Sequence, residues 1–352
     1  MTRAPSSPVP PEPSRRSAVP TPRFTSLEIC AGAGGQALGL EQAGFAPLAL
    51  IDNDRDSCET LRANREEWNV LEADLLTFDP AEHPYLYDVD LMAAGPPRVR
   101  SLNGGKQLPQ DLEARRLLKA TIYLVHAVRP RALLIENIAD LVESAHLTDL
   151  RAFVRDELEH LGYELHRTVL DAADFGVPQE RRQGFFVALR KGYTGRFQWP
   201  EPVVNQTPTV GDVLEFSMAE RGWPHASDWA AWAARPAPTI VGGSKNRGGP
   251  DLGQSGSKAA WEKLGVNGNS LGDAVPAQDF PWPPETEDRK LLPKLTIPQV
   301  ATLQSFPPRW ELRGNKTSRY CQIGHASPPP VAAAMGRAIA AALGDEGGPG
   351  RE

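Results

Sequence analysis

The chain has 352 residues and a mass of 38.3 kDa, and its 38 Lys and Arg residues against 44 Asp and Glu residues give a formal net charge of −6. With 40% hydrophobic residues it is neither a fibre nor a wholly disordered chain, and no apolar run approaches the roughly 18 residues of a membrane span. Three scattered cysteines exclude a disulfide framework and a cysteine-rich zinc site, so we expect a cytoplasmic protein without a metal ion.

Residues 1–23 are rich in Pro, Ser and Arg and contain almost no large apolar side chains. Such a segment cannot bury enough surface to offset the entropy of ordering it, which predicts a disordered tail. It also lacks the apolar centre of a secretory signal.

From Phe24 onward, short apolar runs alternate with helical patterns. The expected strands are Thr25–Cys30, Leu48–Ile51, Asn69–Leu71, Val89–Ala93 and Ala132–Ile135. The expected helices run from after Gly35 to about Gly44 and over Asp56–Asn64, Leu117–Val128, Leu147–Leu161 and Val331–Leu343. This alternation predicts an α/β fold with a doubly wound, mostly parallel sheet, in which ligands bind at the carboxyl ends of the strands.

The composition changes after Arg190, where Pro, Gly, Trp and Asn become frequent. We therefore predict a sheet domain over 24–195 plus 318–344, a smaller loop-rich lobe over 196–317 and a flexible tail over 345–352. Between residues 289 and 319, seven basic residues against one acidic give a local charge of +6. This segment is a candidate for phosphate contacts, although a solvated charged face would look the same.

A glycine-rich turn, Ala31–Gly35, stands where the first strand passes into a helix. Its glycines Gly32, Gly34 and Gly35 let a ligand approach the backbone, and the helix N-terminus favours negative charge. Asp52 ends the second strand, where a carboxylate can accept both ribose hydroxyls, and Asp74 follows the third. Together these predict an adenosine-containing ligand, either a nicotinamide dinucleotide or S-adenosylmethionine (SAM).

Further motifs separate these two ligands. They are Gly95-Pro96-Pro97, Glu136-Asn137-Ile138, Phe175–Gln183, Arg235–Ile240, Leu303–Pro307 and Gln322–Pro329. In this order, over residues 24–343, the series resembles the bacterial DNA (cytosine-5) methyltransferase family of restriction–modification systems. A nicotinamide oxidoreductase is disfavoured, because the Pro-Pro and Glu-Asn motifs have no role in hydride transfer.

The resemblance implies a Rossmann-like SAM-binding domain, a target-recognition lobe and double-stranded DNA with a flipped cytosine. In that mechanism a cysteine thiolate attacks cytosine C6, a glutamate assists at N3, and C5 takes the methyl group. Carried over by position, Glu136 and Arg181 are the catalytic candidates, Asp52 holds the ribose and Asp74 the adenine amine. The full cofactor-binding set is Ala31, Gly32, Gly34, Gly35, Asp52, Asn53, Asp74 and Pro96.

The reacting centre departs from the family pattern at three positions. Arg98 occupies the place of the nucleophilic cysteine, and the spacing to Gly105-Lys106-Gln107 indicates substitution rather than a shifted loop. A guanidinium stays protonated and has no lone pair for attack on carbon. Gln183 replaces the second arginine of the Gln-x-Arg-x-Arg motif, and His325 replaces the asparagine of Gly-Asn-Ala.

Two functions therefore remain open. The chain is either a working methyltransferase with an unrecognised nucleophile, or a non-catalytic relative that binds SAM, DNA or an active methyltransferase partner as a specificity or regulatory subunit. A glycine-rich and cationic segment, 242–249, is a candidate groove-entering loop. Arg98 itself is a candidate contact to DNA phosphate or to an extruded base.

Overall fold

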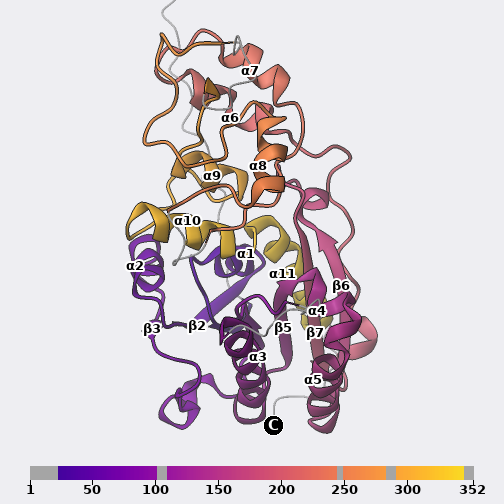
Figure 1. The fold of residues 1–352 in the computed structure, drawn as a ribbon. Coiled ribbons are helices and arrows are strands. Elements are labelled where there is room, and N and C mark those ends of the chain that lie inside the picture. The colour runs from indigo at the N-terminus through magenta and orange to yellow at the C-terminus, as the bar shows by residue number, and fades with distance from the viewer. Residues whose placement is uncertain (1–22, 101–108, 244–248, 283–290, 345–352) are drawn as a thin grey trace, which may run out of the picture.

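The structure is a computed structural model that describes residues 23–100, 109–243, 249–282 and 291–344. The predicted tails, apart from Arg23, lie outside the described residues, as do Gly105–Gln107 and positions 244–248 of the proposed groove loop. Two lobes are visible, one built around a sheet and one of short helices and loops that stands over one edge of that sheet (Figure 1).

The described residues form a seven-stranded sheet in the order β3-β2-β1-β4-β5-β7-β6. Its strands are β1 (Phe24–Ile29), β2 (Phe45–Asp52), β3 (Val70–Glu72), β4 (Leu91–Ala94), β5 (Ala132–Ile138), β6 (Tyr163–Asp171) and β7 (Arg182–Arg190). Neighbouring strands are parallel except that β7 runs antiparallel to both β5 and β6. The predicted doubly wound, mostly parallel sheet is confirmed.

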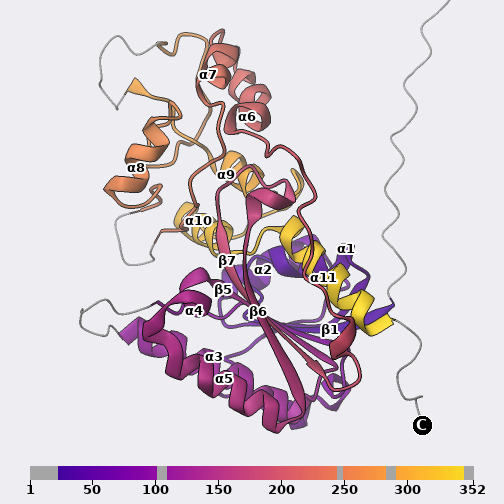
Figure 2. The ribbon, with the colours of Figure 1, turned by 90° about the vertical axis from the view of Figure 1, so that its right-hand side faces the viewer.

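Helices cover both faces of the sheet (Figure 2). On one face lie α3 (Pro109–Val128) and α5 (Thr148–His160), and on the other lie α1 (Gly35–Gln42) and α11 (Pro329–Gly344), with α2 (Arg55–Asn64), α4 (Ala139–Glu143) and α10 (Lys316–His325) near the edges. Short 3-10 turns occur at Pro80–Glu82, Pro84–Leu86, Ala145–Leu147, Ala172–Phe175 and Thr194–Arg196. The backbones of α1 and α11 approach closely at Gly39, where an added Cβ would lie 2.5 Å from the Ala332 Cβ.

Two parts of the fold differ from the sequence expectations. Helix α3 begins at Pro109, eight residues before the predicted start at Leu117, because its first turns are polar and Leu112 is exposed, so that they show no apolar stripe. The sequence patterns did not predict strands β6 and β7. Strand β6 carries mostly half-buried residues without regular alternation, and this removes the usual signal of a strand.

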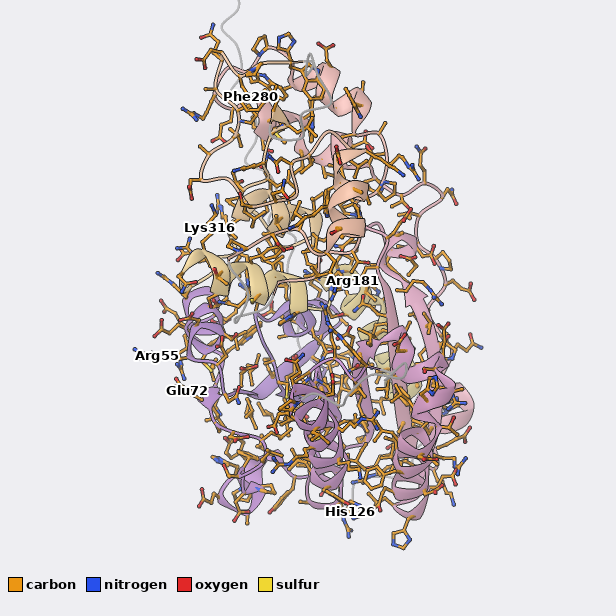
Figure 3. The ribbon with its side chains drawn as sticks, viewed as in Figure 1. Arg55, Glu72, His126, Arg181, Phe280 and Lys316 are labelled. Atoms are coloured by element: carbon orange, nitrogen blue, oxygen red, sulfur yellow. The ribbon has the colours of Figure 1, made fainter. Side chains whose placement is uncertain are left out.

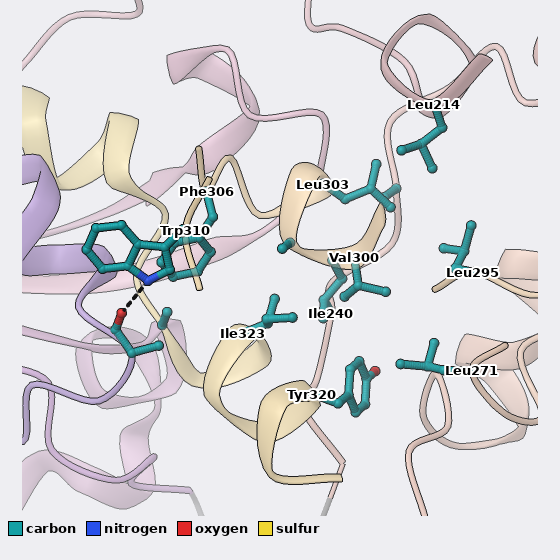
Figure 4. Close-up of a cluster of buried hydrophobic side chains, with 14 of the residues drawn as sticks. Leu214, Ile240, Leu271, Leu295, Val300, Leu303, Phe306, Trp310, Tyr320 and Ile323 are labelled. Carbon is teal, nitrogen blue, oxygen red and sulfur yellow. Dashed lines mark hydrogen bonds between the residues drawn. The ribbon is translucent and has the colours of Figure 1, made fainter. Parts of the chain in front are cut away.

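The second lobe contains α6 (Val210–Ala219), α7 (Ala226–Trp232), α8 (Ser255–Glu262) and α9 (Ile297–Leu303). Its core contains the fully buried Trp223, Trp229 and Trp261. That core is continuous with residues beneath the glycine turn, since one buried cluster joins Trp229 to Leu303, Trp310 and Ala33 (Figure 4). The two lobes are therefore packed together through shared apolar contacts.

Strand register brings the predicted site to one edge. Ile29 of β1 pairs with Ala94 of β4, and Ala94 pairs with Ile135 of β5, so the residues that follow these strands lie side by side. Because β7 is antiparallel to β5, its first residues return to the same edge, and Gln183 lies opposite Ile138.

Candidate functional site

The glycine turn has the backbone shape that its composition requires. Gly32 and Gly34 have φ values of 54° and 81°, in the left-handed region that favours glycine. Gly34 is the N-cap of α1 and provides no side-chain hydrogen bond to the first turn, which also contains no acidic residue. The N–H groups at the start of α1 are therefore not capped by a carboxylate or hydroxyl, as an anion site requires.

Asp52 is tied directly to this turn. Its Oδ2 accepts the Gly32 N–H at 2.8 Å and its Oδ1 accepts the Asp54 N–H at 2.8 Å. These two bonds orient the carboxylate toward the glycine turn. Asn53 follows it on the surface.

Asp74 lies two residues beyond the end of β3 and is exposed. Its Oδ1 accepts the Leu76 N–H at 2.9 Å. Asp74 lines an open hollow of about 430 Å³ together with Glu72, Phe78 and His83. The rings of Phe78 and His83 stack with their centres 5.0 Å apart.

Trp310 fixes the glycine turn from outside the sheet domain. Its indole Nε1–H donates to the Ala33 carbonyl at 3.0 Å, as Figure 4 shows. The Arg65 guanidinium lies 5.5 Å from the Trp310 ring centre and 5.6 Å from that of Trp68, and Glu41 holds Arg65 by an ion pair at 2.8 Å. The sequence motifs did not single out Trp310, and its position after the Leu303–Pro307 motif was the available signal.

The loop after β4 is fixed by Asn137. Its Nδ2 donates to the carbonyls of Pro96 and Pro97 at 3.0 and 3.3 Å, and its Oδ1 accepts the Val99 N–H at 2.9 Å. Asn137 thus positions the Pro-Pro segment against the end of β5. Pro96 is buried and Pro97 is exposed at the edge.

Glu136 stands beside this loop and is only 8% exposed. Burial raises the pKa of its carboxyl group, and Arg181, Gln183 and Arg98 oppose that shift. The Gln183 Nε2–H donates to Glu136 Oε1 at 2.7 Å and also to Ser327 Oγ at 3.1 Å. Gln183 therefore links Glu136 to Ser327.

Arg181 lies at the junction of the lobes (Figure 3). Its Nη1–H group contacts the carbonyls of Ile240 and Gly324 at 3.0 and 3.1 Å. Complete burial and the neighbouring Arg98 lower the pKa of Arg181 to about 10, which still leaves it charged at neutral pH.

Arg98 points to the same place and is only partly exposed. Its Nη2–H donates to the Gly324 carbonyl at 2.6 Å and its Nη1–H to the Val241 carbonyl at 3.2 Å. Burial is the main cause of its lowered pKa. The structure thus brings Arg98, Glu136 and Arg181 together, as predicted.

The remaining predicted positions lie apart from this cluster. Arg182, whose side chain alternates with those of Arg181 and Gln183 along the chain, pairs with Glu143 at 2.6 Å. His325 is exposed at the end of α10. In the basic segment, Lys316 bonds to Asp273 at 2.8 Å, and the Arg319 Nε–H donates to the Gly314 carbonyl at 2.7 Å.

Comparison with known families decides between a methyltransferase and a nicotinamide oxidoreductase, the two classes that share this kind of sheet. The family model of C-5 cytosine-specific DNA methylase matches residues 24–341. The chain belongs to this family. Membership implies SAM as the cofactor and DNA as the substrate, and it sets the nicotinamide alternative aside.

Named relatives and solved structures agree with this family. The chain is 43% identical to the type II methyltransferase M.NaeI of Lentzea aerocolonigenes, over 91% of this chain and 76% of that protein. It is 40% identical to M.NgoMIV of Neisseria gonorrhoeae, over 92% and 99%. The S. pombe Dnmt2 methyltransferase shares the fold, with a TM-score of 0.61, 17% identity and coverage of 91% and 99%. Within the described ranges, no helix is long and apolar enough to cross a bilayer.

Proposed function

We propose that this family member binds SAM and double-stranded DNA and does not itself transfer a methyl group to cytosine. One observation carries the proposal: the nucleophile position holds Arg98, whose guanidinium donates to the carbonyls of Gly324 and Val241. A protonated guanidinium cannot add to cytosine C6. Where a nucleophile has been removed from another enzyme, the loss in rate is on the order of a million-fold.

The cysteines of the chain offer no substitute thiolate. Burial and nearby carboxylates raise the pKa of Cys30 and of Cys58 to about 12 in each case. The Cys58 Sγ–H also donates to the Asp52 carbonyl at 3.4 Å. Cys321 is buried in α10, a different element from the loop that carries position 98.

The cofactor end supports SAM binding. The uncapped start of α1 suits the carboxylate of the methionine part, and the turn residues Ala31–Gly35 allow close approach of the backbone. Asp52 would hold the ribose, Asp74 the adenine amine, and Asn53 and Pro96 would line the site. SAM would supply an electrophilic methyl group there.

In this proposal, the predicted lobe 196–317 and its basic residues bind the DNA. A protein that binds DNA and SAM without chemistry fits a specificity or regulatory subunit of an active methyltransferase. The competing function, a working methyltransferase, is favoured by relatives that are named type II methyltransferases. The predicted domain boundaries are the same for both functions.

The deciding experiment measures transfer of labelled methyl from SAM to unmethylated DNA of high sequence complexity. We expect no incorporation by the wild type and by Arg98→Ser, and measurable incorporation by Arg98→Cys if the rest of the centre is competent. Incorporation by the wild type would refute the proposal.

Cofactor binding is tested separately by thermal unfolding. SAM at about 100 times its Kd should stabilise the fold by about 2.7 kcal/mol and raise the Tm by at least about 2 °C. A Tm that stays constant in saturating SAM would show that the glycine turn is retained only as part of the fold.

A further inference from the structure

At the base end of the site, both guanidinium groups bond to backbone carbonyls, while within the described residues Arg181 Nε and Gln183 Oε1 remain buried without a partner. Arg98 and Arg181 both donate to the carbonyl of Gly324, at 2.6 and 3.1 Å. Arg98 continues to the Val241 carbonyl, and Arg181 to the Ile240 carbonyl. Each of the two guanidinium groups therefore bridges α10 and the segment 240–241 of the other lobe.

Local electrostatics stabilise the two neighbouring cations. The Gly324 carbonyl belongs to the last turn of α10, where the helix dipole is negative. The Glu136 carboxylate adds an opposite charge that acts on both arginines. Its Oε1 in turn accepts the Gln183 amide, so the acid that would read a cytosine edge is already bonded within the protein.

The junction has little spare room. An added Cβ on Gly324 would lie 2.1 Å from the Gly242 nitrogen, and one on Gly242 would lie 3.1 Å from the Cys321 carbonyl oxygen. A cysteine side chain ends one atom beyond Cβ, whereas arginine extends to a planar fork of donors. Only the longer side chain at position 98 reaches across from the loop after β4 to these carbonyls.

From these contacts we infer that Arg98 closes the pocket that a flipped cytosine would enter, so that the chain binds duplex DNA with its bases stacked. The inference rests on the proposed DNA binding and defines the form of DNA that is bound. A base that enters between Glu136 and Arg181 has to displace the Arg98 guanidinium from two carbonyls. Flipping costs unpairing and unstacking energy, which pocket contacts must return, and here those contacts are already made internally.

The test compares binding to a fully paired duplex with binding to the same duplex carrying one unpaired cytosine. An unpaired base removes most of the cost of flipping, so an open pocket binds it more tightly. We expect a Kd ratio near 1 for the wild type and a preference of about tenfold or more for the unpaired cytosine in Arg98→Ala. A duplex with an unpaired thymine controls for bending of the DNA at a bulge.

Arg100→Ala is the matched variant, because Arg100 is an exposed cation two residues away. It should weaken binding to both duplexes equally and keep their ratio near 1. A tenfold preference of the wild type for the unpaired cytosine overturns the inference, even if Arg98→Ala does not fold. A Kd ratio near 1 in folded Arg98→Ala also overturns the inference. Neither measurement involves methyl transfer. A wild-type preference for the unpaired cytosine without incorporation would refute the closed pocket alone, whereas incorporation by the wild type would refute both proposals, because transfer requires a flipped cytosine.

Discussion

The two ends of the site lie on one edge of one sheet but differ in how their polar groups are used. At the cofactor end, the N-cap of α1 is a glycine without a capping side chain, and Asp52 accepts the backbone N–H groups of Gly32 and Asp54. At the base end, Arg98, Arg181, Glu136 and Gln183 bond to carbonyls or to each other. At the base end most of these polar groups therefore bond within the protein, although among the described residues Arg181 Nε and Gln183 Oε1 are buried without a partner.

This difference indicates which parts of the family's chemistry still constrain the sequence. Gly34 and Gly35 leave no room for a side chain, because a Cβ on Gly34 would lie 2.6 Å from Leu61 and one on Gly35 would lie 2.2 Å from the Ser327 carbonyl oxygen. The base end has instead exchanged a thiol for a guanidinium and an arginine for Gln183, and the exchanged groups still form a bonded network. The proposed combination of SAM and DNA binding without methyl transfer would produce this pattern.

The largest expected effect concerns Glu28, in the strand that leads to the cofactor turn. It is fully buried, and within the described part of the chain neither carboxylate oxygen has a hydrogen-bond partner. Burial, and secondarily Glu41, raises its pKa from 4.5 to about 8. The folded state therefore holds a proton that the unfolded state releases between these two pH values.

Stability should consequently fall as pH rises from 4.5 to 8, by about 1.4 kcal/mol per pH unit from this group, and change no further above 8. Glu28→Gln cannot ionise, so at pH 8 it should be more stable than the wild type by about 4 kcal/mol, with little difference at pH 4.5. Urea unfolding across this range provides the measurement. Parallel pH profiles for the two proteins would show that Glu28 finds a partner.

The next effect tests whether the base end is saturated with positive charge. Gln183→Arg restores the family residue but adds a third guanidinium beside Arg98 and Arg181. We expect a loss of about 3 kcal/mol of unfolding free energy in the wild-type background. In an Arg98→Cys background the loss should be smaller by about 1 kcal/mol or more, as a double-mutant cycle would report. Additive effects within about 0.5 kcal/mol would mean that the two positions do not share an electrostatic environment.

Sequence predicted the sheet, its connections and the edge that carries the site, because strand-end motifs in a parallel sheet converge whatever their separation along the chain. It also placed Arg98, Glu136 and Arg181 together. It did not predict that the Arg98 guanidinium bonds to the carbonyls of Gly324 and Val241. Every residue has a backbone carbonyl, so the sequence does not indicate which ones act as acceptors. Nor did it reveal the unpartnered Glu28, because partners across a sheet depend on packing rather than on spacing.

At the cofactor end, Gly35 and Gly32 form a matched pair. A Cβ on Gly35 would lie 2.2 Å from the Ser327 carbonyl oxygen, whereas one on Gly32 meets nothing within 4 Å. Gly35→Ala should therefore cost about 2–3 kcal/mol of stability and abolish the shift in Tm caused by SAM. Gly32→Ala should cost about 1 kcal/mol, from its positive φ alone. Equal losses in thermal or urea unfolding would show that backbone strain, rather than contact with Ser327, makes Gly35 necessary.

The smallest effect tests whether the second lobe helps to hold the cofactor turn. Trp310→Phe keeps an aromatic ring beside Arg65 but removes the Nε1–H that bonds to the Ala33 carbonyl, together with part of the buried indole ring. Loss of one buried hydrogen bond should lower stability by about 1 kcal/mol and weaken SAM binding several-fold, with DNA affinity unchanged. Trp68→Phe, whose ring also faces Arg65, is the control that should leave SAM affinity within about twofold. Calorimetric titration measures the SAM affinity of each variant. If the sheet domain alone held the glycine turn, the two variants would bind SAM with the same affinity.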